Sequence, residues 1–362
     1  MNTNTIHCGD CLDVMRGWPD ACIDAVVTDP PYGLSFLGKK WDYDVPGVEL
    51  WREVYRVLKD GGRLLAFSGA RTQHRMVCRI EDAGFVIEDC MMWLYGSGFP
   101  KHKSKLKPAY EPICVARKGS VSELNIDAGR IGVEERTYKT GRWPANVGSG
   151  PHRIKLDNHG PGDTGIGMMD GSGRDRTTTV TGRWPANVCM DEAAALALDQ
   201  QSGVSVSVPR TPSRTHHTGG VTDFERGSET SLHSDSGGAS RFFYCAKASR
   251  SERNEGCGEL PERQGVGVGA LRDSGERDNL PRANVHPTVK PVDLMRWLIR
   301  LTTFDGQLIL DPFFGSGTTG VAANLEGRQW IGIERDPDYC AIARARTAQQ
   351  GIFASGASAD AG

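Results

Sequence analysis

Both ends of the chain alternate short apolar runs with amphipathic stretches, whereas its middle is poor in apolar residues. The N-terminal pattern predicts strands at 23–28, 63–68, 85–94 and 111–116 and helices at 48–59 and 71–83. The C-terminal pattern predicts helices at 291–303, 318–326 and 336–348 and strands at 308–310 and 329–333. Strands that alternate with helices predict an α/β fold, with a mostly parallel sheet covered on both faces.

The middle segment, 148–285, has a different texture. Val, Ile, Leu and Phe make up only 21 of its 138 residues, which is below the ~20% at which a packed core becomes doubtful. We therefore expect long loops here, interrupted by a short helix at 191–201 and a core strand at 241–247. The small, polar residues 351–362 predict a disordered tail.

One eight-residue sequence, Thr-Gly-Arg-Trp-Pro-Ala-Asn-Val, occurs twice, at 140–147 and at 181–188. Its Arg and Trp side chains (Arg142 and Arg183, each followed by Trp) could stack on nucleic acid. The alternative, which we favour, is that each Trp anchors a loop to the body of the protein.

The net charge of −2 excludes a histone-like polycation but allows a local basic groove. Residues 96–160 contain 12 Lys and Arg against 6 Asp and Glu. Four alternating lysines in this segment either contact phosphates or lie on a solvated loop: Lys101, Lys103, Lys105 and Lys107. No apolar run is long enough to span a bilayer, and the N-terminus lacks a signal-peptide pattern, so we expect a soluble, cytoplasmic protein. The ten cysteines are scattered, which favours structural thiols and no metal site.

The predicted strand at 23–28 ends in Asp29-Pro30-Pro31-Tyr32. Two prolines stop the hydrogen-bond ladder and fix the backbone. A carboxylate and a carbonyl then face the crevice where open α/β sheets bind ligands. Such a site suits a planar ring with an amino group: Asp29 and the Pro30 carbonyl accept its N–H bonds, and Tyr32 stacks on the ring.

A second strand leads into Asp311-Pro-Phe313-Phe-Gly315-Ser316-Gly317-Thr318. The glycines allow the backbone to approach a ligand closely at a helix N-terminus. No lysine follows, so this is not a phosphate loop of the ATP-binding type. Glu334 ends the next predicted strand, at the position where a carboxylate binds ribose hydroxyls. Turn and acid together indicate a cofactor that contains adenosine.

Together these segments resemble the S-adenosylmethionine-dependent DNA methyltransferases that modify adenine N6 or cytosine N4. Residues 29–32 match the catalytic motif of that family and 311–317 match its cofactor loop. The catalytic motif precedes the cofactor motif, as in the circularly permuted β group. Asp10 lies where this group places an acid near the cofactor adenine, and His-Pro-Thr-Val-Lys-Pro at 286–291 matches a further motif.

The resemblance implies a Rossmann-like class I methyltransferase fold built from both ends of the chain. It implies a catalytic half at 1–118, a loop-rich target-recognition insert at 119–240 and a cofactor-binding half at 241–350. The implied cofactor ligands are Asp10, Asp311, Phe313, Gly315, Ser316, Gly317, Thr318 and Glu334. The implied partner is double-stranded DNA; a homodimer and a cognate restriction endonuclease remain open, as does a bacterial or a phage origin.

The resemblance further implies that a flipped base is methylated on its exocyclic amine without a covalent enzyme intermediate. Adenine N6 is favoured over cytosine N4, because Asp rather than Ser leads the motif. No Pro-Cys dipeptide is present, which argues against cytosine-C5 chemistry. Two alternatives from other classes are a catalytically inactive DNA-binding module and a nicotinamide-dependent oxidoreductase. The intact motifs argue against the first, and the second leaves the motif at residues 29–32 unexplained.

Overall fold

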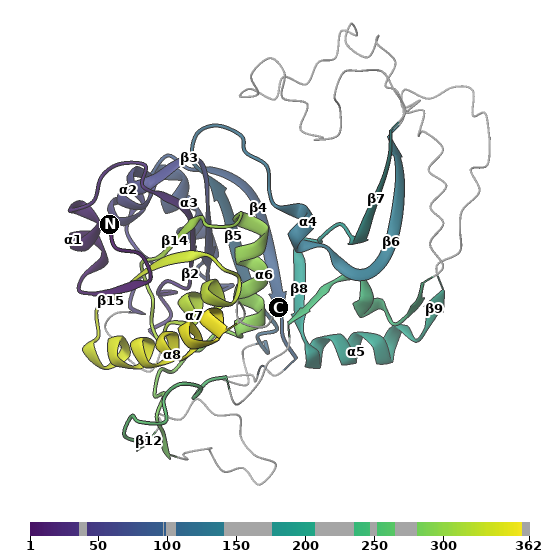
Figure 1. Ribbon diagram of the computed structural model, residues 1–362. Helices are drawn as coiled ribbons and strands as arrows, with labels where there is room; N and C mark the ends of the chain where they lie inside the picture. The colour runs from purple at the N-terminus through teal and green to yellow at the C-terminus, as the bar shows by residue number, and fades with distance from the viewer. Residues whose placement is uncertain are drawn as a thin grey trace, which may run out of the picture.

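The computed structural model describes residues 1–35, 42–96, 98, 106–140, 176–206, 235–246, 252–264 and 281–356. One nine-stranded sheet forms the centre of the molecule (Figure 1). Its spatial order is β1 (Thr5–Cys8), β15 (Gln329–Glu334), β14 (Leu308–Asp311), β2 (Ile23–Thr28), β3 (Leu58–Phe67), β5 (Tyr110–Arg117), β4 (Val86–Leu94), β8 (Val188–Asp191) and β11 (Tyr244–Ala246). Only β5 runs antiparallel to its two neighbours in this sheet, so the predicted α/β fold with a mostly parallel sheet is confirmed.

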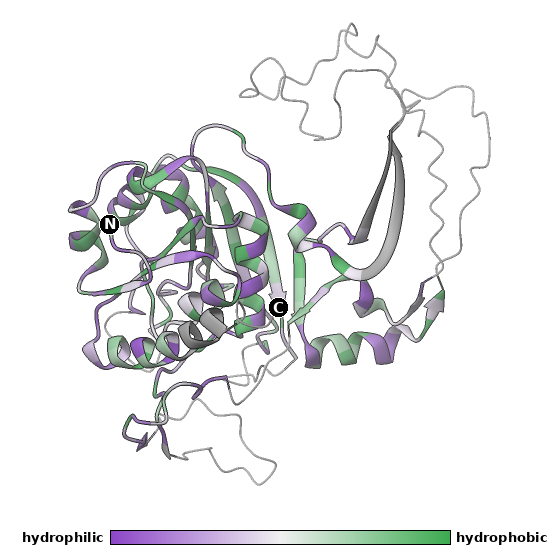
Figure 2. Cartoon of the chain, in the orientation of Figure 1, coloured by the Kyte–Doolittle hydropathy of each residue, from purple (hydrophilic) through white to green (hydrophobic). Residues whose placement is uncertain are grey.

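Helices cover both faces of the sheet. One layer contains α1 (Cys11–Arg16), α2 (Val48–Val57) and α3 (Gln73–Asp82), and the other contains α6 (Val292–Thr302), α7 (Thr318–Leu325) and α8 (Pro337–Gly356). Neighbouring strand residues point to opposite layers: Val26 and Leu64 pack with the first, Val27 and Leu65 with the second. Hydrophobic residues accordingly concentrate in the strands between the helices (Figure 2). None of the described helices is both long enough and apolar enough to cross a membrane.

The remaining elements lie largely beside this body. Three strand pairs form small separate sheets: β6 (Ile131–Thr140) with β7 (Arg176–Arg183), β9 (Ser205–Val206) with β10 (Ser236–Gly237), and β12 (Arg263–Gln264) with β13 (Pro281–Arg282). The short helices are α4 (Ile126–Gly129), α5 (Glu192–Ser202) and the 3₁₀ helix η3 (Ala239–Phe242). Figure 1 shows β6 and β7 projecting from the body as a long ribbon, with α5 below it.

Three sequence expectations need correction. Strand β8 lies inside the predicted recognition insert, yet it pairs with β4 in the central sheet. The predicted strand at 241–247 is reduced to β11, because residues 239–242 form η3. Helix α8 continues to Gly356, so 351–356 are helical rather than a disordered tail. A single glycine at 351 costs a helix only about 1 kcal/mol, which the helix-favouring residues before it can offset. Residues 357–362 lie outside the described part.

The sheet reverses its winding direction between β14 and β2. The chain leaves β2 through α2 to reach β3 on one side, and it leaves β14 through α7 to reach β15 on the other. Open α/β sheets bind ligands at the carboxyl ends of the strands at such a switch point. Both sequence motifs, 29–32 and 311–317, follow these two strands, so the topology places them side by side.

Strand β15, next to this crevice, packs closely against an aromatic ring. Gly332 of β15 faces the ring of Phe314, and that ring stacks on Trp330 with centroids 5.0 Å apart. A methyl group at position 332 would overlap the Phe314 ring. We expect Gly332→Ala to lower the free energy of unfolding by about 1–3 kcal/mol, measured by chemical denaturation. Gly47→Ala is the matched control, because nothing lies within 4 Å of an added Cβ there; equal stability losses in both variants would contradict this packing argument.

Candidate active site

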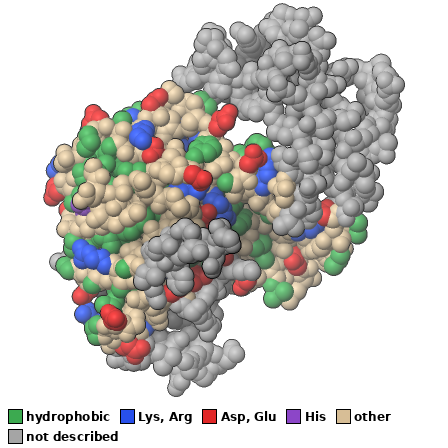
Figure 3. All heavy atoms as spheres, in the orientation of Figure 1, with side chains coloured by type: hydrophobic (Ala, Val, Ile, Leu, Met, Phe, Trp, Pro, Cys, Tyr) green, Lys and Arg blue, Asp and Glu red, His purple; other side chains and the backbone are tan. Residues whose placement is uncertain are grey.

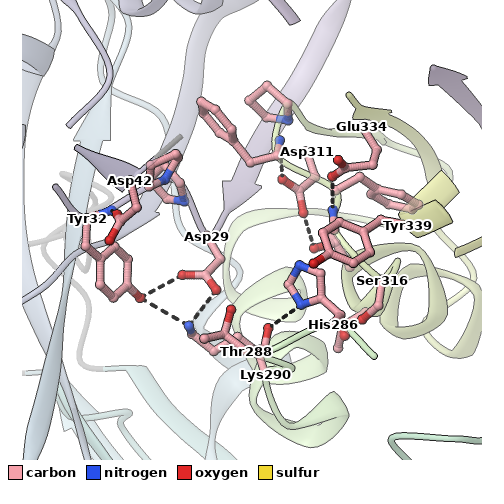
Figure 4. A pocket seen from close by; sticks show the side chains of 18 of the residues that line it. Asp29, Tyr32, Asp42, His286, Thr288, Lys290, Asp311, Ser316, Glu334 and Tyr339 are labelled. Carbon is pink, nitrogen blue, oxygen red and sulfur yellow. Dashed lines mark hydrogen bonds and ion pairs between the residues drawn. The ribbon is translucent and has the colours of Figure 1, made fainter. Parts of the chain in front are cut away.

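A cavity of about 1130 Å³ lies at the carboxyl ends of β2 and β14. The N-terminal half of the chain lines it with residues 29–32 and Glu111. The C-terminal half lines it with residues 286–291, 311–316 and 333–337. Figure 4 shows side chains from both halves pointing into this space. The predicted catalytic and cofactor motifs therefore share one cavity.

The turn after β2 is held by a carboxylate that the sequence analysis did not single out. Asp42 is 2% exposed. Its Oδ1 accepts hydrogen bonds from the backbone N–H of Tyr32 at 2.7 Å and of Gly33 at 2.9 Å, and its Oδ2 accepts from the N–H of Leu34 at 3.1 Å. Gly33 has a φ of +67°, a left-handed conformation that glycine adopts without strain. Asp42 therefore fixes the backbone that presents Asp29 and Pro30 to the cavity.

Four polar side chains meet beside this turn: Asp29, Tyr32, Glu111 and Lys290. The Tyr32 hydroxyl lies 2.7 Å from Asp29 Oδ1 and 3.0 Å from Glu111 Oε2. The Lys290 ammonium donates to Asp29 Oδ2 at 2.6 Å and lies 3.2 Å from Glu111 Oε2. We call these four side chains the carboxylate–lysine cluster. It contains two carboxylates and one ammonium, so its formal charge is negative.

Burial and charge act together on this cluster. Burial raises the pKa of Tyr32 well above its ordinary value, and the charges of Asp29 and Glu111 raise it further. Burial opposes the charged form of Lys290, but the two carboxylates outweigh it and raise the pKa of that lysine. At neutral pH the Tyr32 hydroxyl therefore keeps its proton and Lys290 stays an ammonium.

The turn between β14 and α7 brings backbone close to the other side of the cavity. Gly315 and Gly317 have φ values of +52° and +82°. A Cβ at Gly315 would lie 2.8 Å from Nε2 of His286, so only glycine fits there. Glu334 Oε2 accepts the N–H of Gly315 at 2.8 Å, and its Oε1 accepts the N–H of Asp336 at 2.8 Å. Each carboxylate oxygen retains acceptor capacity for a ligand, and burial raises the pKa of Glu334.

Asp311 organises this turn from beneath. Its side chain is 3% exposed. It accepts hydrogen bonds from the hydroxyls of Thr28 at 2.6 Å and Thr319 at 2.5 Å, and from the N–H of Phe313 at 3.0 Å. Burial raises the pKa of Asp311 to about 6. With three donors already bound, Asp311 shapes the loop that surrounds a ligand.

A buried arginine holds the same turn. Arg346 of α8 is 2% exposed, and its Nη1 donates to the carbonyl and hydroxyl oxygens of Ser316 and to the hydroxyl of Thr318. Two residues of the predicted cofactor set thus bind Arg346. Asp10, another of that set, lines the cavity while its Oδ1 caps α1 by accepting the N–H of Leu12 at 3.0 Å.

His286 separates the two motifs. Its ring lies against Gly315 and makes an edge contact with Tyr339, with ring centroids 4.6 Å apart. Its Nδ1 lies 2.9 Å from the carbonyl oxygen of Thr288. Burial lowers the pKa of His286 to about 4, so the imidazole is neutral at pH 7. A neutral ring that donates from Nδ1 presents Nε2 as an acceptor.

The structure describes only some of the residues that were predicted to contact DNA. Lys101, Lys103, Lys105 and Arg142 lie outside the described residues. Lys107 is exposed, and its Nζ donates to the carbonyl of Gly96 at 2.7 Å. Arg183 is 7% exposed and forms an ion pair with Asp235, so its guanidinium supports the fold. Figure 3 shows acidic and basic side chains interspersed on this face of the described part.

In the second copy of the repeat, 181–188, the residues that contact the rest of the protein differ from those we expected. Trp184 is 54% exposed and lies under the guanidinium of Arg130 at 5.6 Å. The contacts that anchor this copy come from Arg183 and from Asn187, whose amide donates to Asp89 Oδ1 at 3.1 Å. The favoured interpretation, an anchoring Trp, is therefore wrong for Trp184.

Four residues of the site were missed as functional residues by sequence reasoning: Asp42, Glu111, Lys290 and Arg346. Only Lys290 had a signal, since it belongs to the quoted segment 286–291. Glu111 and Arg346 act through partners far away in sequence, since Glu111 lies 79 positions from Tyr32 and Arg346 lies 30 positions from Ser316. Asp42 binds backbone N–H groups only 8 to 10 positions away. No local pattern reports such pairs.

The comparisons with known proteins show the family of this chain. A DNA methylase family model, of the N6/N4 type, matches residues 23–345. The chain is 52% identical over 64 residues to Type II methyltransferase M2.DpnII of Streptococcus pneumoniae, which is 18% of this chain and 24% of that relative. It is 36% identical over 103 residues to Type II methyltransferase M.Cfr9I of Citrobacter freundii, which is 28% of this chain and 31% of that relative. The matches thus span about a quarter to a third of these relatives.

Among solved structures, the chain is similar to PvuII DNA methyltransferase (cytosine-N4-specific), with a TM-score of 0.48 and 16% identity, covering 98% of this chain and 92% of that one. The family match covers most of the chain. The protein belongs to the N6/N4 DNA methylases, and the predicted family resemblance is confirmed.

Proposed function

We propose that the protein transfers a methyl group from S-adenosylmethionine to the exocyclic amine of a flipped base in double-stranded DNA, with adenine N6 as the target. The observation that carries this proposal is the shared cavity: Asp29 and Pro30 line one side, and the Gly315 turn and Glu334 line the other. Adenine is proposed as the target base because the motif begins with Asp29, as it does in the adenine enzymes that this chain resembles.

The cavity residues fit the cofactor. Glu334 offers carboxylate oxygens for the two ribose hydroxyls. Gly315 brings backbone close to the ligand where any Cβ would overlap His286. Phe313 and Asp10 line the cavity near Glu334 and would hold the adenine ring and its amino group. When bound, S-adenosylmethionine supplies an electrophilic methyl group on a sulfonium.

The chain's own residues activate the amine. The lone pair of an exocyclic amine is delocalised into its ring, so the nitrogen is a poor nucleophile. Asp29 and the Pro30 carbonyl would accept the two N–H bonds and thereby increase the electron density on nitrogen. Tyr32 lies beside both acceptors and would contact the ring of the base. Since Asp42 fixes this turn, both acceptors are held before the base arrives.

The recognition insert and the lysine-rich segment before it would provide the DNA contacts. Lys107, which is exposed, is proposed to contact phosphate, together with the lysines at 101, 103 and 105. Trp184 offers an exposed ring for stacking. An endonuclease with the same recognition site would make the protein the modification enzyme of a restriction system.

Expression in a bacterial host that lacks DNA methylases tests the proposal. We expect genomic DNA from that host to carry N6-methyladenine within one recurring sequence, detected by sequencing that reports modified bases. An Asp29→Ala variant expressed alongside is the control and should leave the DNA unmodified. N4-methylcytosine would overturn the assigned base, and unmodified DNA at a normal protein level would overturn the proposed activity.

A further inference from the structure

We propose that Glu111 is a positioning residue for the reaction: it competes with Asp29 for the Tyr32 hydroxyl and the Lys290 ammonium, and so leaves Asp29 free to accept the target amine. This inference rests on the proposed function, because it concerns how Asp29 becomes available to a base. Glu111 belongs to β5, which is separated from β2 by β3 in the central sheet. Neither the sequence motifs nor the proposed amine contacts include it.

The Tyr32 hydroxyl supplies the first part of the argument. It has a single proton, yet two carboxylate oxygens lie within hydrogen-bond distance, Asp29 Oδ1 at 2.7 Å and Glu111 Oε2 at 3.0 Å. The hydroxyl therefore donates to only one of them at a time. When it donates to Glu111, Asp29 Oδ1 loses a donor and can bind an amine N–H in its place.

Lys290 supplies the second part. Its Nζ lies 2.6 Å from Asp29 Oδ2, 3.2 Å from Glu111 Oε2 and 3.1 Å from the Tyr32 oxygen, and its side chain is only 9% exposed. The three ammonium protons thus have three acceptors. Without the charge of Glu111, the buried ammonium would pair with Asp29 alone, and Asp29 would be a weaker acceptor for the base.

The surroundings of the cluster bear on its pH dependence. Among the described residues, three further titratable groups lie close enough to interact with it electrostatically: Tyr95, His286 and Asp311. Tyr95 and His286 are neutral at pH 7. The two cluster carboxylates share one ammonium, so removing the charge of either one changes the electrostatic environment of the other.

The test compares Glu111→Gln with the wild-type chain in single-turnover methylation of plasmid DNA from a host without DNA methylases, using tritiated S-adenosylmethionine across a pH series. We expect the plateau rate to fall about 10- to 100-fold, the worth of a hydrogen bond to a charged group. We also expect the acid limb of the profile to move to lower pH, because a like charge next to Asp29 has been removed. Affinities for DNA and S-adenosylmethionine should stay unchanged.

Glu88→Gln is the matched control. Glu88 is 23% exposed, against 22% for Glu111, and it bridges Arg63 and Arg117 away from the cavity. We expect this variant to lose stability and to keep the wild-type pH profile. An unchanged rate in Glu111→Gln, or a slower rate with an unmoved acid limb, would overturn the positioning role. A wild-type chain that methylates no DNA would contradict the proposed function instead.

Discussion

Asp29→Ala is expected to reduce methyl transfer to DNA by at least about 10³-fold, because the variant lacks the charged acceptor that activates the amine. The fold should survive the change. Lys290 would still have Glu111 Oε2 at 3.2 Å, so no buried ammonium is left without a counter-charge. The cofactor residues around Gly315 and Glu334 do not hydrogen-bond to Asp29, so affinity for S-adenosylmethionine should be retained.

Three measurements check this expectation. Tritium transfer from labelled S-adenosylmethionine to unmethylated DNA gives the rate, calorimetric titration gives the cofactor affinity, and thermal unfolding gives the stability. Asp29→Asn is the informative companion, because the amide keeps one acceptor oxygen without the charge and should retain more activity than alanine. Turnover in Asp29→Ala within tenfold of wild type would refute the role of Asp29. Loss of cofactor binding would show that the two motifs are coupled.

The sequence was sufficient for the central layers of the fold. Side chains alternate between the two helix layers along a strand of only six residues: Val26 points to one layer and Val27 to the other. The motifs could be placed in one cavity because both follow strands of a parallel sheet, whose carboxyl ends share an edge. The positions of Asp29 and Glu334 could therefore be predicted from the local hydrophobic pattern and the order of the strands.

Other parts depend on contacts that no local pattern encodes. Strand β8 has only four residues and is recognisable only through its pairing with β4, nearly a hundred residues earlier. Asp311 reads as a ligand from its motif, but the threonines at 28 and 319 occupy its oxygens. Arg346 sits on a helix that appears ordinary in sequence, and its role emerges only when that helix packs on the glycine turn.

Glu334→Ala is expected to weaken binding of S-adenosylmethionine by about 100-fold or more. Two losses add up: the carboxylate proposed to accept from the ribose hydroxyls is removed, and the N–H groups of Gly315 and Asp336 lose their acceptor. Each hydrogen bond to a charged group is worth about 1.5–3 kcal/mol. Because Gly315 is held in a left-handed conformation beside His286, loss of this bond should also loosen the turn.

Calorimetric titration with S-adenosylmethionine measures the effect directly, independent of DNA. Glu326→Gln is the control: Glu326 binds Arg296 and Arg300 at the far end of α7 and does not line the cavity. Its variant should bind the cofactor as the wild type does. Glu334→Gln should fall between wild type and alanine, because its single carbonyl oxygen can satisfy one N–H while its NH₂ group opposes the other. Equal affinities in all four proteins would mean that the ribose is bound elsewhere, and the cofactor would have to be placed differently in the cavity.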